Sequence, residues 1–459
     1  MRDLTRGSIL GHLLSMTLFL MGSMICQSLY FLADLYWIGR IGRDAIAAVG
    51  LAANVMLIVL ALSQSLGVGT TALASRAVGA GDRDRAIVVF NQTLSLAIAC
   101  GAMFLVAGLL LAGPYVDWLA ADALTRTYAR QYLLWFVPAL ALQFPLISAG
   151  AALRGSGMVK PTVLILAVSV VLNLVLAPVL ILGWGTGRPL GVPGAAIATL
   201  AAVAIGSLML TIYILAIHTD LRVQVRHWKP SPAVWREVIA IGAPSGAELG
   251  VLGIYLLIVY SLLKPFGAAA QGGFAVGARI GQSLILPAVA VAMANAPIVG
   301  QNYGARNIAR IRSAFAVAAA AGVVFMLAMM LVVRAFADPL VRFFTSDEAV
   351  IVVGVGYLRI LALTFVATAV IFAVVSVFQG LGRTLRPFLS AVIRLIAFVV
   401  PAVVLSRSPD SSLQTLWVVS AASIGLQALV NLAFVAREFA GLRAVGATES
   451  VLYSAHRQE

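Results

Sequence analysis

Four polar side chains lie along the first long apolar segment of the chain, and their spacing places them on one face of a helix. They occur at i, i+4, i+7 and i+11: Ser23, Gln27, Tyr30 and Asp34. A polar stripe on an otherwise apolar helix faces a wet cavity or a neighbouring helix rather than lipid. A carboxyl group there can exchange a proton, or bind a hard cation such as Na⁺ together with amide and hydroxyl oxygens. Asp34 is therefore the first candidate for a site of ion exchange.

Two more polar residues stand inside apolar segments. Of the 17 acidic residues, fifteen fall in predicted loops or tails, and the other two, Asp34 and Glu248, fall in predicted helices, where a charge at the centre of a span costs on the order of 2.5–3.5 kcal/mol. Glu248 shares a helix face with Ser245 and Tyr255, and Asn173 lies in the middle of another such segment. Structural alternatives stay open: an interfacial carboxylate at Asp34, a protonated packing carboxyl at Glu248, and a helix–helix hydrogen bond at Asn173.

The segments that carry these residues predict an all-α integral membrane protein. The chain has 459 residues, of which 62% are hydrophobic and 10% are charged, whereas soluble domains are about 25% charged. Twelve windows hold at most one Asp, Glu, Lys or Arg, and each supplies the roughly 20 apolar residues that a spanning helix needs. The windows are 7–33, 45–75, 86–116, 131–153, 161–187, 189–219, 238–263, 265–305, 313–333, 349–382, 387–406 and 411–436.

Basic residues indicate the orientation of these spans. An even number of spans puts both termini on one side, and the majority of the 31 Lys and Arg residues fall on that side. The positive-inside rule then predicts that both termini are cytoplasmic. The net charge of +14 thus reflects membrane topology, and we expect no nucleic-acid partner.

The chain repeats itself after about 225 residues. Gly79-Ala80 matches Gly304-Ala305, and the glycine-rich turn that begins at Gly155 resembles the one that begins at Gly380. Six spans per repeat make the two halves parallel, which is an arrangement found in secondary transporters. The sequence therefore predicts twelve transmembrane helices in two pseudo-symmetric six-helix lobes around a central cleft. The predicted boundaries are 1–218 for the N-lobe, 219–236 for a cytoplasmic inter-lobe loop, 237–440 for the C-lobe and 441–459 for a cytoplasmic tail.

No enzyme motif is recognisable. The chain lacks a P-loop, and its four histidines are not arranged at the spacing of metal ligands or of a catalytic triad. Cys26 and Cys100 both lie in apolar stretches, which does not suggest a disulfide framework. We expect neither an enzyme nor a bound cofactor beyond the coupling ion.

The motifs together resemble the MATE family of multidrug and toxic compound extrusion transporters, of the DinF-like or NorM-like prokaryotic type. The resemblance covers nearly the whole chain. It rests on LADLYWIGRIGRDAIAAVG (32–50), SRAVGAGD (75–82), LRGSGMVKP (153–161), NLVLAP (173–178), GAAIAT (194–199), IGAPSGAE (241–248), IVGQNYGA (298–305) and FQGLGR (378–383). It implies an antiporter of organic, often cationic, compounds or drugs that works by alternating access in exchange for H⁺ or Na⁺. It also implies a multi-pass protein of a bacterial-type plasma (inner) membrane, and we expect a monomer in contact with lipid.

The resemblance also implies a set of site residues. In the DinF-like branch the site of the N-lobe matches Tyr30, Asp34, Asn173 and Thr199, and we add Gln27 to these candidates as a residue of the cleft. The second aspartate of that branch is replaced by Ala177, which favours H⁺ over a tight Na⁺ site at Asp34 and Asn173. The NorM branch has acids on the seventh and tenth helices. Glu248 is on the right helix, but the tenth has Thr368 and no acid.

Two other functions stay open. A flippase for lipid-linked precursors shares the wider superfamily architecture, and its cleft is expected to be rich in basic residues that receive phosphates. Arg279, Arg359 and Arg394, each inside or at the end of an apolar segment, keep that reading open. A channel or membrane scaffold is the third reading, and the duplicated halves with acids in their spans argue against it.

Overall fold

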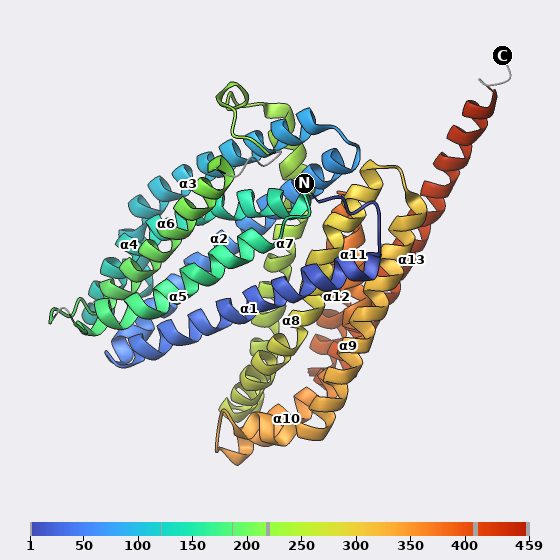
Figure 1. Ribbon diagram of the computed structural model, residues 1–459. Helices are drawn as coiled ribbons and strands as arrows, with labels where there is room; N and C mark the ends of the chain where they lie inside the picture. The colour runs from blue at the N-terminus through green and yellow to red at the C-terminus, as the bar shows by residue number, and fades with distance from the viewer. Residues whose placement is uncertain (1, 121, 186, 217–220, 407–411, 456–459) are drawn as a thin grey trace. The chain divides into compact units, whose positions relative to one another are not determined.

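The computed structural model describes residues 2–120, 122–185, 187–216, 221–406 and 412–455, without the side chains of 30–33, 35, 225 and 443–455. Helices are its regular elements in these ranges (Figure 1). They are α1 (Ile9–Gly39), α2 (Arg43–Gly79), α3 (Arg83–Leu119), α4 (Ala123–Gly155), α5 (Lys160–Leu182), α6 (Val192–Ala216), η1 (Val225–His227), α7 (Pro232–Leu263), η2 (Lys264–Phe266), α8 (Ala268–Gly304), α9 (Ile308–Arg342), α10 (Glu348–Ala362), α11 (Phe365–Gly380), α12 (Leu385–Ser406) and α13 (Leu413–Ala455).

The predicted spans are confirmed, with one of them broken. Among the described residues, 11 helices are long and apolar enough to cross a membrane, and a bent pair brings the number to 12. That pair, α10 and α11, bends by 54° within the predicted window 349–382. The last helix, α13, continues to Ala455, through most of the segment that was predicted to be a tail.

The chain divides into two compact units. Unit 1 comprises Met1–Asp3 and Leu18–Gly246, and unit 2 comprises Leu4–Thr17 and Ala247–Glu459. The division therefore falls inside α1 and α7. The beginning of α1 belongs to unit 2 and the rest of α1 to unit 1, whereas the beginning of α7 belongs to unit 1 and the rest of α7 to unit 2.

Helix boundaries follow the sequence repeat. α2 and α8 both contain 37 residues, and Gly79 and Gly304 end them. The glycine-rich turns at Gly155 and Gly380 likewise follow the ends of α4 and α11. The two glycines of each pair lie 225 residues apart.

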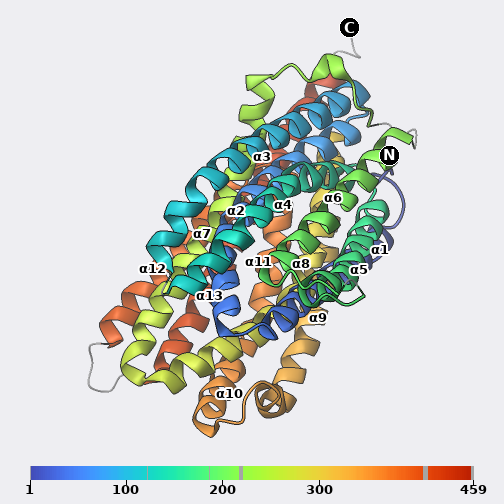
Figure 2. The same ribbon diagram turned by 90° about the vertical axis from the view of Figure 1, so that its left-hand side faces the viewer.

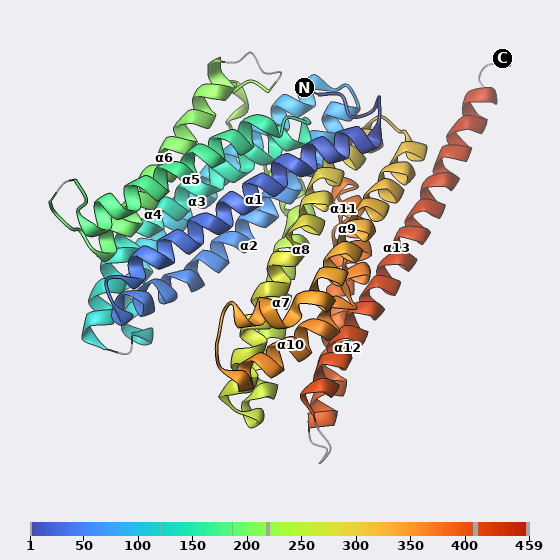
Figure 3. The ribbon, with the colours of Figure 1, turned by 60° about the horizontal axis from the view of Figure 1, so that its bottom comes forward.

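Within unit 1, α4 is the central helix. It packs against α2, α3 and α6, as Figure 2 shows, and α6 packs in turn against α5. α1 runs alongside α5 in both Figure 1 and Figure 3. Side chains from α1, α4, α5 and α6 can therefore meet inside one unit.

Two buried amides on α3 hold the polar segment that precedes α7. Gln92 donates to the carbonyl oxygens of His227 at 2.5 Å and Lys229 at 2.8 Å, and it accepts from the Ser231 N–H at 2.9 Å. Asn91 holds the same segment by donating to the Arg222 carbonyl at 2.8 Å. The backbone of the predicted inter-lobe loop is thus hydrogen-bonded to side chains of α3 in unit 1.

Replacing Gln92 with leucine is expected to release this segment. Each hydrogen bond contributes roughly 0.5–1.5 kcal/mol, so the loss of three bonds should speed tryptic cleavage after Arg222 and Arg226 by at least about tenfold. The measurement is limited proteolysis of purified protein. Ser95→Ala is the control, because among the described residues the Ser95 hydroxyl bonds within α3 alone, to the Gln92 carbonyl. Equal cleavage of both variants would contradict the role given to Gln92.

Candidate functional site

Asp34 lies in the last third of α1, in the part of the helix that belongs to unit 1. Its side chain is partly buried. The helix continues past it to Gly39, so the backbone around Asp34 is fixed and its carboxyl group is directed by the helix rather than by a loop.

Asn173 connects Asp34 to a third helix. In the orientation that gives each amide atom a complementary partner, the Asn173 nitrogen donates to Asp34 Oδ1 at 3.2 Å, and its oxygen accepts from the Thr199 N–H at 3.3 Å. Asn173 is fully buried and Thr199 is 2% exposed. A carboxylate on α1, an amide on α5 and a backbone donor on α6 therefore form one chain of hydrogen bonds.

Glycines bring α5 and α6 close enough for this contact. A side chain at Gly194 would meet the Leu180 carbonyl oxygen at 2.5 Å, and one at Gly206 would meet Ser169 Oγ at 2.3 Å. Thr199 lies between these two glycines on α6, and its own hydroxyl bonds back to the Ala195 carbonyl at 3.1 Å. Small residues at these two positions thus allow the close helix packing that sets Thr199 beside Asn173.

Tyr132, on the central helix α4, is a further polar side chain in the neighbourhood of Asp34. It is 3% exposed, and Asp34 lies close enough for the two groups to interact electrostatically. Tyr132 is not among the residues that the sequence predicts for the site, because an aromatic residue within a long apolar segment carries no periodic or charge signal. Its position on the helix that touches α2, α3 and α6 is evident only from the fold.

Among the described residues, the hydrogen-bonded group of Asp34, Asn173 and Thr199 contains one carboxyl group, with an amide and a hydroxyl group beside it. Ala177 lies one helical turn after Asn173 and is fully buried, so no second carboxylate stands at that position. A single carboxylate held by an amide can bind and release a proton. It offers a cation less charge than a pair of carboxylates would.

The other sequence candidates have different surroundings. Gln27 is exposed, and the Tyr30 side chain lies outside the described residues. Glu248 belongs to unit 2, and its Oε1 atom is buried without a hydrogen-bond partner among the described residues. Ser245 Oγ, one turn earlier on α7, is likewise buried without a hydrogen-bond partner among the described residues. Within unit 1 the structure therefore groups Asp34, Asn173 and Thr199.

Curated relatives resemble this chain over most of its length. A protein named FAD transporter from Shewanella oneidensis is 24% identical over 382 residues, which is 83% of this chain and 84% of the relative. A probable multidrug resistance protein NorM from Thermotoga maritima is 24% identical over 384 residues, which is 82% of this chain and 81% of the relative.

Solved structures share the fold. A MOP superfamily transporter from Pyrococcus furiosus, whose binding pocket is described as having reverse polarity, superimposes with a TM-score of 0.89 at 25% identity and covers 96% of this chain and 98% of its own. An outward-facing multidrug resistance MATE family transporter has the same TM-score, identity and coverage. The MatE family model matches residues 20–179 and 244–404, one stretch in each half of the chain. The chain is therefore a multi-pass membrane protein that belongs to the MatE family of multidrug efflux transporters.

Proposed function

We propose that the chain is a secondary active antiporter that exports organic compounds in exchange for protons by alternating access. The single observation that carries the proposal is the buried chain from Asp34 through Asn173 to Thr199, in which one carboxyl group is the exchangeable site. Ala177, at the position of a second carboxylate, favours H⁺ as the coupling ion over Na⁺. In this proposal Asp34 binds a proton on one side of the membrane and releases it on the other.

The setting that we propose is a bacterial-type inner membrane, with both termini cytoplasmic and the protein acting as a monomer. The basic segment 222–236 supports this orientation, because Lys and Arg gather on cytoplasmic loops. The role is that of a transporter and not of an enzyme.

A flippase or exporter of phosphate-bearing compounds is the second candidate. Arg394 on α12 favours it, because a cation in the middle of a span suits an anionic ligand. The named substrate of the Shewanella oneidensis relative, FAD, carries phosphates, so substrates in this family need not be cations.

Transport into proteoliposomes tests the antiport proposal and the choice of coupling ion. The purified protein is reconstituted, a fluorescent organic cation is added, and H⁺ and Na⁺ gradients are imposed one at a time. We expect substrate movement with the H⁺ gradient and none with the Na⁺ gradient alone. Movement driven by Na⁺ alone would overturn the choice of ion, and the absence of movement with either gradient would overturn the antiport proposal.

Glu248 is proposed to assist from unit 2. Its buried Oε1 atom lacks a partner among the described residues, which leaves this oxygen available to a proton or to a substrate group. We expect Glu248→Gln to slow gradient-driven transport by roughly three- to tenfold, because the amide keeps the shape of the side chain but cannot release a proton. Initial rates in the same proteoliposomes measure the effect, and Glu237→Gln, a change at an exposed residue paired with Arg85, is the control. An unchanged rate would remove Glu248 from the mechanism.

A further inference from the structure

Arg394 is a guanidinium group near the middle of a membrane-spanning helix. It lies about halfway along α12 and is only partly buried, yet its side chain points into unit 2. The guanidinium carbon lies 5.3 Å from the centre of the Tyr255 ring, and Tyr255 is 9% exposed. A cation over the face of an aromatic ring is stabilised by about 0.5–2 kcal/mol, which offsets only part of the cost of a charge at this depth.

No acid of the described part of unit 2 forms an ion pair with Arg394. Four of these acids have other partners: Asp338 and Glu348 pair with Arg342, Glu438 pairs with Arg383 and Arg386, and Asp347 caps α10. The fifth, Glu248, has one carboxyl oxygen without a hydrogen-bond partner among the described residues. The N–H groups of a guanidinium match the two oxygens of a carboxylate or phosphate. The side chain of Arg394 therefore has the charge and the donors for an oxyanion.

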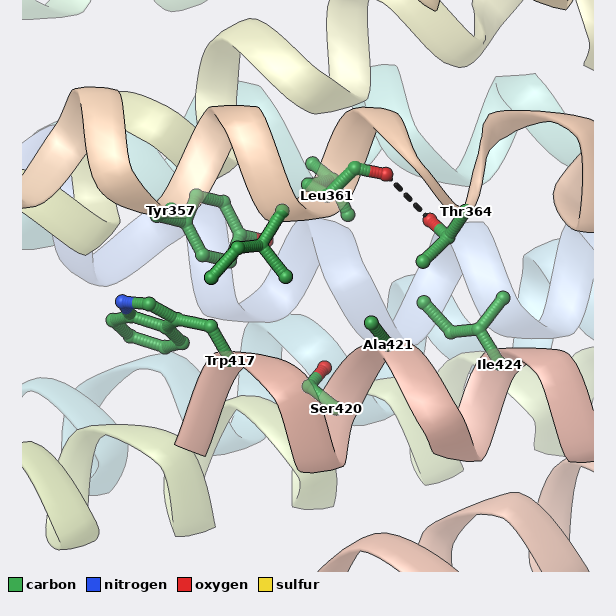
Figure 4. A pocket seen from close by; sticks show the side chains of 8 residues that line it. Tyr357, Leu361, Thr364, Trp417, Ser420, Ala421 and Ile424 are labelled. Carbon is green, nitrogen blue, oxygen red and sulfur yellow. Dashed lines mark hydrogen bonds between the residues drawn. The ribbon is translucent and has the colours of Figure 1, made fainter. Parts of the chain in front are cut away.

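Hydroxyl groups extend from Arg394 towards a small pocket. The Tyr255 hydroxyl is hydrogen-bonded to Ser420 Oγ at 2.8 Å, and Ser420 also lines the pocket. Tyr357 lines the same pocket and interacts electrostatically with both Tyr255 and Arg394. Figure 4 shows Tyr357 and Leu361 facing Trp417, Ser420 and Ala421 across this pocket.

The pocket lies at the break between α10 and α11. Thr364 stands in the break, donates from its hydroxyl to the Leu361 carbonyl at 2.7 Å, and lines the pocket (Figure 4). Helix breaks within a membrane are tolerated where they are buried in protein or line a cavity, and broken helices form substrate sites in transporters. The N-terminus of α11, the positive end of its dipole, begins here at Phe365.

We propose that Arg394, Tyr255 and Ser420 form a subsite in unit 2 that receives a carboxylate or phosphate group of the transported compound. This inference rests on the proposed transport function. It differs from the proposed role of Glu248, because the subsite selects the charge of the substrate rather than the coupling ion.

Equilibrium binding to purified protein tests the subsite with two matched pairs of fluorescent probes. Flavin mononucleotide differs from riboflavin by one phosphate, and rhodamine 110 differs from rhodamine 123 by a free carboxylate in place of its methyl ester. We expect the wild-type protein to bind at least one oxyanion probe about tenfold more tightly than its matched partner. The pair that shows the preference tells whether phosphate or carboxylate is recognised.

Arg394→Gln is expected to abolish the preference, whereas Arg359→Gln should keep it. Arg359 lies in the same unit and is exposed. Arg359→Gln therefore removes one positive charge, as Arg394→Gln does, but at a position outside the subsite. Arg394→Lys should retain the sign of the preference with a smaller ratio, because an ammonium group keeps the charge but not the paired donors. Size-exclusion chromatography confirms that each variant is folded.

Two results would overturn the subsite: equal binding within both probe pairs by the wild type, or an unchanged preference in Arg394→Gln. Because binding needs no ion gradient, the outcome is independent of the transport assay. A protein that shows the preference but moves no substrate under either gradient would overturn the proposed antiport and leave the subsite in place.

Discussion

Asp34→Asn is expected to lower proton-driven transport by at least about 100-fold. Asparagine has nearly the same shape as aspartate and can still bond to Asn173, which lies 3.2 Å from Asp34 Oδ1 in the wild type. It cannot take up or release a proton, however, and Ala177 offers no second carboxyl at this site. The expected loss is therefore one of coupling rather than of folding.

The measurement is the initial rate of substrate movement in proteoliposomes with an imposed pH gradient. Exchange of labelled for unlabelled substrate without a gradient should persist in the variant within about threefold, which separates coupling from substrate binding. Asp44→Asn is the matched control, since Asp44 lies in the same unit in the first turn of α2 beside Arg43. Proton-driven transport by Asp34→Asn at the wild-type rate would remove Asp34 from the coupling site.

Gly242→Val is expected to prevent unit 1 from folding normally. A Cβ atom at Gly242 would lie 1.8 Å from the backbone carbonyl oxygen of Ser65 on α2, and a backbone atom cannot turn aside as the end of a side chain can. At Gly246, one turn later, the Ser65 hydroxyl would lie at 2.0 Å and the Ala61 carbonyl at 2.5 Å. This Gly-x-x-x-Gly pair lets α7 approach α2 closely, and its loss should cost more than about 3 kcal/mol.

Thermal unfolding and the monodisperse fraction in size-exclusion chromatography measure this effect. Gly250→Val is the control, because a Cβ atom at Gly250, on the same helix, would meet no described atom within 4 Å. The expected outcome is a large fall in recovered, folded protein for Gly242→Val and a near-normal yield for Gly250→Val. Similar yields for the two variants would show that the α2–α7 crossing tolerates a side chain.

Most of the fold follows from local features of the sequence. Each spanning helix is marked by its own apolar window, and the lobe repeat is marked by glycine turns that end α2, α4, α8 and α11. The break at Ala362–Phe365 is different, because the segment Ala362-Leu363-Thr364-Phe365 contains neither proline nor glycine. The Thr364 hydroxyl, which donates to the Leu361 carbonyl at the 54° bend, is a local feature that can bend a helix, but a threonine in an apolar segment does not by itself mark a break.

The candidate site was predictable in part. Asp34 was recognisable as a charged residue in an apolar helix, and the family resemblance named Asn173 and Thr199 as its neighbours. The structure has hydrogen bonds that join these three residues. Tyr132 and the contact between Arg394 and Tyr255 were not predictable. Each depends on which faces of helices distant in sequence meet, and one aromatic residue among many gives no sign of that.

In the proposed proton antiport, a single carboxyl at Asp34 that carries one proton per cycle would make the electrical work of each cycle depend on the charge of the substrate. If one proton enters for each molecule that leaves, exchange for a monovalent cation moves no net charge, so only the pH difference drives it. Exchange for a zwitterion moves one charge, which is worth about 2.3 kcal/mol for each 100 mV of membrane potential. Exchange for a singly charged anion moves two charges, so the same protein would concentrate anionic compounds far more steeply than cationic ones at a given voltage.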